Sequence, residues 1–267
     1  MSIPPRSPVA ASPGTCSHPP PTSLSPAVWR SPAPRLVSMA MVLVALGTTA
    51  LAIDIPVADW FKDGPWPPSI PRALVAVADE FHRVIGFSEV FAHTLGAAII
   101  LLTVLVLDRS VAWPNCRWPA IRWPSRQPTG QQQTFARMIG AAATGGLLTD
   151  IIKLLVDRVR PRAFDFAACA SVWDTFNEAV IATINGSRSD INSFPSGHSA
   201  VAAGLGAALA WKYPQGTWLF AIFALLAASQ RIVYSAHFPS DACFGLAVGL
   251  LGAALFLRAP PGASAGS

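Results

Sequence analysis

One histidine and one aspartate near the C-terminal end of the chain have the types and spacing needed for nucleophilic catalysis. Asp241 follows His237 by four residues, about one turn of helix, and Pro239 between them suits the first turn of a helix. The carboxylate of Asp241 can therefore accept one ring N–H of His237 and leave the other nitrogen free to attack an electrophile. We expect this pair where the last apolar segment begins.

A second histidine lies in the segment Pro195-Ser196-Gly197-His198, directly before another apolar segment. A serine at a helix N-cap, followed by glycine, leaves free backbone N–H groups and the positive end of the helix dipole facing outwards. Such a helix N-terminus binds anions. The segment therefore predicts an anion site made by Ser196 and the N–H of Gly197, with His198 beside it.

Several cations stand where an anion site could use them. Lys153 and Arg160 are seven residues apart, two turns of helix, and both point the same way if the helix continues to Pro161. Arg231 ends a later apolar segment, shortly before His237. Phosphoryl transfer demands positive charge and donors around three equatorial oxygens, an in-line nucleophile and an acid for the leaving oxygen. These residues supply those parts if their segments meet in space.

The elements that must position these residues are six apolar runs. Only 12% of the chain is charged and 52% is hydrophobic, and the mean hydropathy is +0.45, which favours a bilayer protein over a soluble one. Each run is near the length needed to cross ~30 Å of hydrocarbon. We expect an all-α, polytopic membrane protein with six transmembrane helices. The runs cover residues 36–53, 87–107, 135–156, 198–212, 216–234 and 240–257.

The composition also excludes several classes of protein. A nucleic-acid-binding protein would need a dense patch of Lys and Arg on a soluble face. The cysteines at Cys16, Cys116, Cys169 and Cys243 form no CxxC pair and no zinc spacing, and whether Cys169 and Cys243 pair stays open. No cluster has the carboxylates of a magnesium phosphatase, so we expect no metal and no cofactor. A transporter would need polar residues in helix centres, where these runs are nearly uncharged.

The basic residues predict the orientation of the spans. If the N-terminal tail lies in the cytoplasm, the cytoplasmic segments hold ten basic residues against a single acid, in accord with the positive-inside rule. Both termini are then cytoplasmic, and the segment 157–195 is extracytoplasmic, as in a bacterial plasma-membrane protein. Lys153, Arg158, Arg160 and Arg162 lie on the disfavoured side, so another constraint must hold them there. All the motifs then meet at the outer surface of the membrane.

The chain is predicted to be one membrane domain between two tails. Apolar residues at helical spacing between 74 and 85 favour an interfacial helix on the outer leaflet, with an ordinary amphipathic connector as the alternative. The predicted parts are a disordered Pro/Ser-rich cytoplasmic tail at 1–34, a six-helix membrane domain at 35–258 with its motif-bearing core at about 135–258, a cytoplasmic interface loop at 113–128, and a short flexible tail at 259–267.

Three motifs together resemble the signature of the type 2 phosphatidic acid phosphatase (PAP2) family, the membrane relatives of vanadium haloperoxidases. The family's third motif usually begins Ser-Arg, whereas Gln230 precedes Arg231 here. The resemblance implies a PAP2-like helical bundle. The motifs are Lys153-(six residues)-Arg160-Pro161, then Pro195-Ser196-Gly197-His198, then Arg231-(five residues)-His237-(three residues)-Asp241.

The resemblance also implies a reaction and a role for each residue. It implies a metal-independent phosphatase with a phosphohistidine intermediate. His237 would be the nucleophile, Asp241 would orient and stabilise it, and His198 would protonate the leaving oxygen. Water activated by His198 would then release inorganic phosphate. The phosphoryl oxygens would be bound by Lys153, Arg160, Ser196, Gly197 and Arg231.

The implied substrate is a membrane lipid whose phosphate lies at headgroup level on the extracytoplasmic face. Phosphatidate, phosphatidylglycerophosphate, a polyprenyl diphosphate and lipid A phosphates all fit this description, and these residues do not choose among them. A lipid phosphotransferase, which passes the same phosphoryl group to an acceptor other than water, is the alternative. A haloperoxidase would need a soluble helical body, which the hydropathy disfavours. The oligomeric state stays open.

Overall fold

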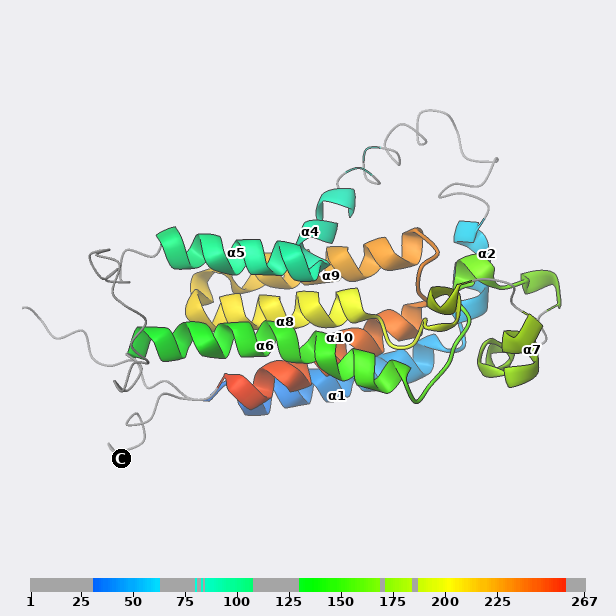
Figure 1. The fold of residues 1–267 in the computed structure, drawn as a ribbon, viewed down its shortest axis with the longest axis horizontal. Helices are drawn as coiled ribbons and strands as arrows, with labels where there is room; N and C mark the ends of the chain where they lie inside the picture. Colours follow the sequence, from blue (N-terminus) through cyan, green and yellow to red (C-terminus); the bar gives the residue numbers. More distant parts are fainter. Residues whose placement is uncertain are drawn as a thin grey trace, which may run out of the picture.

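The computed structural model in Figure 1 describes residues 31–62, 80, 83, 85–107, 130–168, 171–183 and 187–257. Within these residues every regular element is a helix, and the β-type pairing is limited to an isolated bridge between Arg158 and Asn192. The predicted all-α fold is therefore confirmed. The α-helices are α1 (Ala33–Ala50), α2 (Asp54–Lys62), α4 (Glu89–Ala92), α5 (Thr94–Leu107), α6 (Gly130–Lys153), α7 (Glu178–Thr183), α8 (Gly197–Lys212), α9 (Thr217–Val233) and α10 (Pro239–Phe256).

Five short 3-10 helices lie in the connections. Four of them follow α6 and precede α8, in the segment that leads from the first motif to the second, and one joins α8 to α9. They are η1 (Pro161–Ala163), η2 (Phe166–Ala168), η3 (Val172–Phe176), η4 (Arg188–Ile191) and η5 (Pro214–Gly216).

The long helices form a bundle with α8 inside it (Figure 1). α8 packs against α6, α9 and α10, and α10 packs in turn against α1 and α6. The core of the bundle is rich in alanine, whereas large apolar side chains such as Met41, Leu102, Leu147 and Trp218 are exposed on its outside. An apolar exterior around a close-packed core of small residues is the arrangement expected of helices in lipid.

The number of spans agrees with the sequence only in part. By length and composition, α1, α6, α10 and α9 together with η5 could each cross a membrane. Helices 85–92 and 94–107 form a fifth candidate only as a broken pair, because they meet at 77°. α8 has 16 residues, or about 24 Å at 1.5 Å per residue, which falls short of the ~30 Å hydrocarbon core. Four or five candidate spans are supported, and six are not confirmed.

Two local predictions about helices are wrong. The run 87–107 is not one continuous helix, because His93 takes an extended backbone conformation with ψ 137° and separates α4 from α5. The helix that carries Lys153 ends at that residue and does not continue to Pro161. Lys153 and Arg160 therefore do not share a helix face, and tertiary contacts must bring them together.

Several predicted segments lie mostly or wholly outside the described residues. They include the interface loop at 113–128, the C-terminal tail at 259–267 and most of the interfacial helix between 74 and 85. Most of the tail at 1–34 also lies outside, although α1 already begins at Ala33.

Small residues allow α6, α8 and α10 to approach one another closely. A Cβ atom at Gly145 of α6 would lie 2.9 Å from the carbonyl oxygen of Ala200 in α8 and 2.9 Å from the Cα atom of Gly249 in α10. Both neighbours are backbone atoms, which cannot move away as a flexible side chain can. Gly145 therefore sets the separation of three helices that carry the motifs.

We predict that Gly145→Ala lowers the free energy of unfolding in detergent by about 1–3 kcal/mol, because overpacking against backbone forces the helices apart. The neighbouring change Gly146→Ala is the matched control, since its added methyl meets only a side-chain methyl of Val201, at 3.2 Å. Thermal unfolding of both variants measures the difference. Equal stability of the two variants would contradict the close approach at Gly145.

Candidate active site

The three motifs meet at one end of the bundle. The C-termini of α6 and α9 and the N-termini of α8 and α10 lie at this end (Figure 1). The backbone amide of Ser196 donates a 3.0 Å hydrogen bond to the carbonyl of Asp241, which joins the second motif to the third. The amide of Ser193 donates over 2.9 Å to the carbonyl of Arg158, which joins the loop before α8 to the loop after α6. The predicted convergence of distant segments is thus present.

The N-terminus of α8 has the cap that the sequence predicted. Ser196 is the N-cap, and its hydroxyl accepts hydrogen bonds from the backbone amide of Ser199 at 3.4 Å and from the hydroxyl of Ser199 at 2.9 Å. Its side chain is completely buried. The hydroxyl proton of Ser196 stays available for a further acceptor, and so do the amides of Gly197 and His198, because the first amides of a helix have no partner within it.

A cavity of about 190 Å³ opens beside this helix end. Lys153, Gly197 and His198 line it together with His93 and Asp150. A Cβ atom on Gly197 would lie 3.5 Å from the Nζ atom of Lys153, so the ammonium group lies directly over the glycine backbone. Two predicted phosphate-binding residues, Lys153 and Gly197, and the predicted acid His198 therefore share one cavity.

Arg160 and Arg231 bring two more cations to the site. Arg160 donates only a long 3.5 Å hydrogen bond to the carbonyl of Asn192, and Arg231 only long bonds to Glu89 at 3.5 Å and to Gln230 at 3.3 Å. The Nε atoms of both arginines are buried and lack a hydrogen-bond partner among the described residues. Burial, reinforced by the charges of Arg162 and Arg231, lowers the pKa of Arg160 to about 10.

His237 lies in the loop between α9 and α10 and is only 2% exposed. Its Nδ1 atom is 3.7 Å from the Oδ2 atom of Asp241, so the predicted pair is present but exceeds hydrogen-bond length. Burial lowers the pKa of His237 to about 4, although the nearby carboxylate of Asp241 acts in the opposite direction. The ring is therefore neutral at physiological pH, as a nucleophile requires. His198 lies within electrostatic range of His237.

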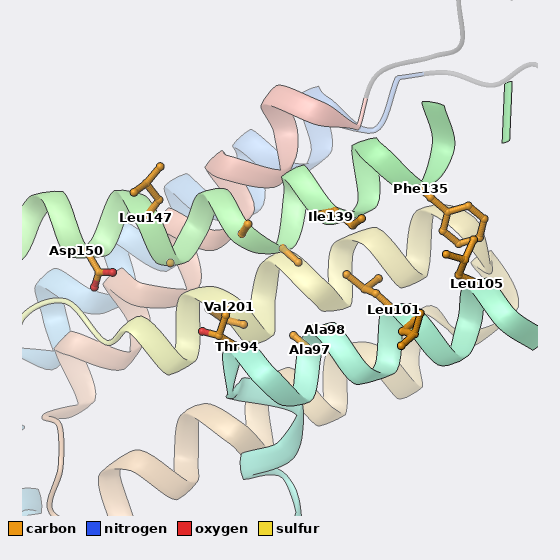
Figure 2. Close-up of a pocket in the computed structure, with 14 residues that line it drawn as sticks. Thr94, Ala97, Ala98, Leu101, Leu105, Phe135, Ile139, Leu147, Asp150 and Val201 are labelled. Carbon is orange, nitrogen blue, oxygen red and sulfur yellow. The ribbon is translucent and has the colours of Figure 1, made fainter. Parts of the chain in front are cut away.

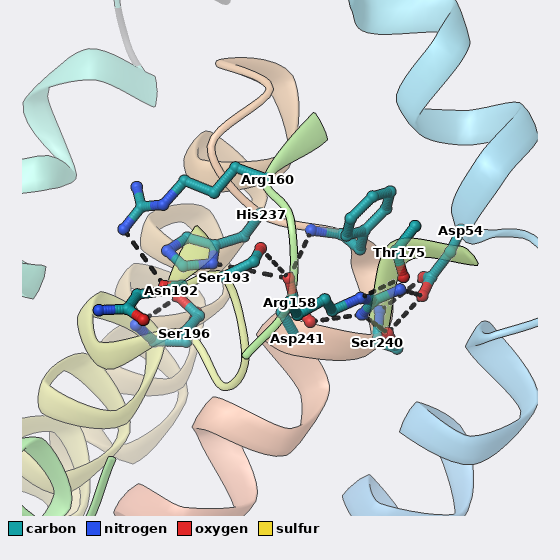
Figure 3. A network of polar contacts seen from close by, with 12 residues as sticks. Asp54, Arg158, Arg160, Thr175, Asn192, Ser193, Ser196, His237, Ser240 and Asp241 are labelled. Carbon is teal, nitrogen blue, oxygen red and sulfur yellow. Dashed lines mark hydrogen bonds and ion pairs between the residues drawn. The ribbon is translucent and has the colours of Figure 1, made fainter. Parts of the chain in front are cut away.

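The carboxylate of Asp241 has more partners than the sequence suggested. Its Oδ2 atom accepts from the hydroxyl of Ser193 at 2.6 Å and from the amide of Phe238 at 3.0 Å, and its Oδ1 atom accepts from Arg158 at 2.5 Å (Figure 3). The sequence placed Arg158 among the outer cations but gave it no role. Two features of the sequence could have indicated that Arg158 is buried. Arg158 lies on the side that the positive-inside rule disfavours, and an acid, Asp54, directly follows an apolar run.

Two further residues near the site were missed by the sequence analysis. The ring of His93, which is exposed at the break between α4 and α5, packs edge-on against that of His198 with 5.5 Å between centroids. Glu89 of α4 forms a 3.5 Å ion pair with Arg231. Neither residue belongs to the three motifs, and only the bend places them here. Cys243 is a free thiol, and Cys169 lies outside the described residues, so their pairing is not tested.

Comparison with known proteins finds relatives of the part of the chain that carries the motifs. The chain resembles two curated bacterial proteins, each named lipid A 1-phosphatase. The protein of Rhizobium johnstonii is 34% identical over 117 residues, which cover 42% of this chain and 44% of the relative. That of Rhizobium etli is 32% identical over 104 residues, or 39% and 40% of the two chains. The chain thus spans less than half the length of these relatives.

No solved structure matches the chain significantly. The family model described as "PAP2 superfamily" matches residues 134–264, a range that contains all three motifs and the helix ends that carry them. Over these residues, just under half of the chain, the protein is similar to the PAP2 superfamily.

Proposed function

We propose that this protein is a membrane phosphatase that removes the phosphate of a lipid phosphate or diphosphate through a phosphohistidine on His237. The observation that carries the proposal is the pair of buried Nε donors on Arg160 and Arg231, which have no partner among the described residues. Leaving a buried donor unpaired is costly, and charge-assisted bonds to phosphoryl oxygens would satisfy both donors. The family match supports the same reaction.

The proposed reaction has two steps. In the first, the Nε2 atom of His237 attacks phosphorus and the bond from phosphorus to the leaving oxygen breaks. His198, which takes up a proton when the anionic substrate binds beside it, donates that proton to the leaving oxygen. In the second, His198 takes a proton from water, the resulting hydroxide attacks the phosphohistidine, and inorganic phosphate leaves. Lys153, Arg160 and Arg231 neutralise the charge on the three equatorial oxygens throughout.

Asp241 has an electrostatic role in both steps. As His237 becomes phosphorylated its ring gains positive charge, which the carboxylate stabilises from the Nδ1 side. The present 3.7 Å separation is long for a hydrogen bond, but catalytic contacts of this kind commonly shorten when substrate binds. We propose that phosphate binding draws the ring onto the carboxylate.

An apolar cavity beside the site supports a lipid substrate. It has a volume of about 480 Å³ and lies between α5 and α6, with residues such as Ala98, Leu101 and Ile139 in its wall (Figure 2). Thr94, Gly146, Asp150 and Val201 line both this cavity and the polar one that holds Lys153 and His198. An acyl chain in the apolar cavity would thus place its headgroup at the cations. Since both relatives are named lipid A 1-phosphatase, we propose a lipid A phosphate as the first substrate to assay.

We propose that the site faces the extracytoplasmic side of a bacterial plasma membrane, with both termini in the cytoplasm. Three basic residues support this orientation, because they lie toward the end of the bundle opposite the site. These are Arg35 near the start of α1, Arg137 in α6 and Lys212 at the end of α8. Basic residues favour the cytoplasmic side.

We predict that His237→Ala lowers phosphate release from every lipid phosphate by at least about 10³-fold, because no other group replaces the nucleophile. Phosphate release from purified protein in detergent, with and without EDTA, measures this, and EDTA is expected to have no effect. His198→Ala is the matched comparison and should accumulate a phosphorylated enzyme that His237→Ala cannot form. A labelled phosphoenzyme in His237→Ala, or magnesium-reversible inhibition by EDTA, would refute the mechanism.

The acid limb of the pH profile of kcat/KM is expected near pH 4, well below the ordinary histidine value of about 6.5. Below this pH the ring of His237 binds a proton and loses its nucleophilic lone pair, and above it the ring is neutral. Phosphate esters themselves titrate near pH 6. The profile is therefore measured with two esters of different pKa, and an acid limb that is due to His237 lies at the same pH for both. A limb between pH 6 and 7 that does not depend on the ester would contradict a buried, neutral His237.

We predict that Ala98→Trp lowers kcat/KM for a long-chain lipid phosphate by about 10- to 100-fold, because the indole fills the apolar cavity and displaces the headgroup. Hydrolysis of p-nitrophenyl phosphate, which has no acyl chain, should stay within twofold of the unmodified protein. Leu95→Trp is the control on the same helix, since Leu95 is 68% exposed and does not line the cavity. Equal losses for both esters would exclude the cavity as the acyl-chain site.

A further inference from the structure

Arg158 is a completely enclosed charge at the end of the bundle that carries the motifs. Its side chain is 0% exposed. One terminal nitrogen donates to Asp241 at 2.5 Å and to Ser240 at 2.8 Å, the other donates to Asp54 at 2.7 Å, and Nε donates to Thr175 at 3.1 Å. Figure 3 shows this guanidinium between the two carboxylates. All three nitrogens of its guanidinium already donate to protein groups, so it is not placed to bind phosphate.

Two aromatic rings hold the guanidinium plane. The central carbon of the Arg158 guanidinium lies 4.6 Å from the ring centroid of Phe176 and 4.0 Å from that of Phe238. A planar cation stacks on rings and presents its N–H groups in a fixed fork, which the compact ammonium of a lysine cannot do. The stacking therefore fixes the direction in which Arg158 meets each carboxylate.

The charges in this cluster are unequal. One cation faces two buried carboxylates, Asp54 from α2 and Asp241 from α10. The carboxylate of Asp54 has further donors besides Arg158. It accepts from the amide of Ser240 at 2.9 Å and from the hydroxyl of the same residue. Ser240 lies in the first turn of α10, where the helix dipole favours a carboxylate. Asp54 thus anchors Arg158 and the start of α10 to each other.

We propose that Arg158 is a positioning residue for the proposed reaction: it holds the Oδ1 atom of Asp241, so that the Oδ2 atom faces the ring of His237. The proposal rests on the proposed function. The hydroxyl of Ser193 and the amide of Phe238 donate to Oδ2 from other directions, so the orientation of the carboxylate is fixed. In this orientation the Oδ2 atom lies 3.7 Å from the Nδ1 atom of His237. Arg158 also withdraws negative charge from Asp241 and so limits how strongly the carboxylate attracts a proton to that ring.

The test compares Arg158→Met with the double change Asp54→Asn/Arg158→Met, assayed on p-nitrophenyl phosphate in detergent. The single change leaves two buried carboxylates without a cation and can prevent folding. The double change removes one charge of each sign and keeps the net charge of the cluster at −1. We expect kcat of the double variant to fall about 10- to 100-fold with KM within twofold, because orientation is lost while the phosphate contacts remain. Arg158→Lys should recover part of the lost kcat.

A second measurement does not depend on phosphatase activity. Nitrogen NMR of the histidine rings in the double variant should show the pKa of His237 raised by about one unit, since removing the cation leaves Asp241 freer to attract the proton. Arg162→Met is the matched control two residues along, because its ion pair with Asp190 is at the surface, and it should keep kcat within twofold and leave that pKa unchanged.

The proposal would be overturned by a folded double variant whose kcat stays within twofold of the unmodified protein, or whose His237 pKa is unchanged or lower. It would also fail if Arg162→Met caused the same losses as the double variant. If the unmodified protein hydrolyses no phosphate ester, the proposed function fails, whereas the NMR shift still decides whether Arg158 acts on Asp241 and His237.

Discussion

The hydrogen bonds and ion pair of the buried Asp241 carboxylate determine the geometry at the end of the bundle that carries the three motifs. Its donors come from the loop after α6, the loop before α8 and the start of α10, and the same residue's backbone carbonyl accepts the amide of Ser196. A buried carboxylate without partners would be very costly, so each of these segments is constrained to reach it. The geometry at His237 follows from that constraint, because His237 lies only four residues after the end of α9 at Val233.

Close helix packing makes this convergence possible. In lipid the hydrophobic effect between helices is weak, so association relies on close contact and satisfied polar groups. Gly145, Ala200 and Gly249 bring the backbones of α6, α8 and α10 together, which leaves α8 enclosed although it is short. The ends of these helices then lie close enough for their loops to exchange backbone hydrogen bonds. The polar site is thus a consequence of small residues along the apolar part of the bundle.

The candidate site lies between a polar environment and an apolar one. Buried cations and a neutral imidazole occupy the loops at the end of the bundle, whereas the cavity between α5 and α6 is apolar along its length. The break at His93 joins these environments, because α5 begins there beside His198, while Glu89 of α4 pairs with Arg231. If residues 87–107 formed one continuous helix, Glu89 and His93 would not both lie beside the site, next to Arg231 and His198.

Much of this protein follows from its amino-acid sequence, because hydrophobic periodicity and helix capping are local properties. The helical fold, the Ser196 cap and the grouping of the three motifs at one end were predicted from residue types and spacing, and the structure agrees. Of the six predicted spans, four or five are supported within the described residues. Other features depend on contacts between residues far apart in the chain, which no local pattern encodes. The end of α6 at Lys153, the bend at His93 and the number of spans are of this kind. So is the burial of Arg158 between Asp54 and Asp241, since a cation so completely desolvated is stable only where the tertiary structure supplies two carboxylates and two aromatic rings around it.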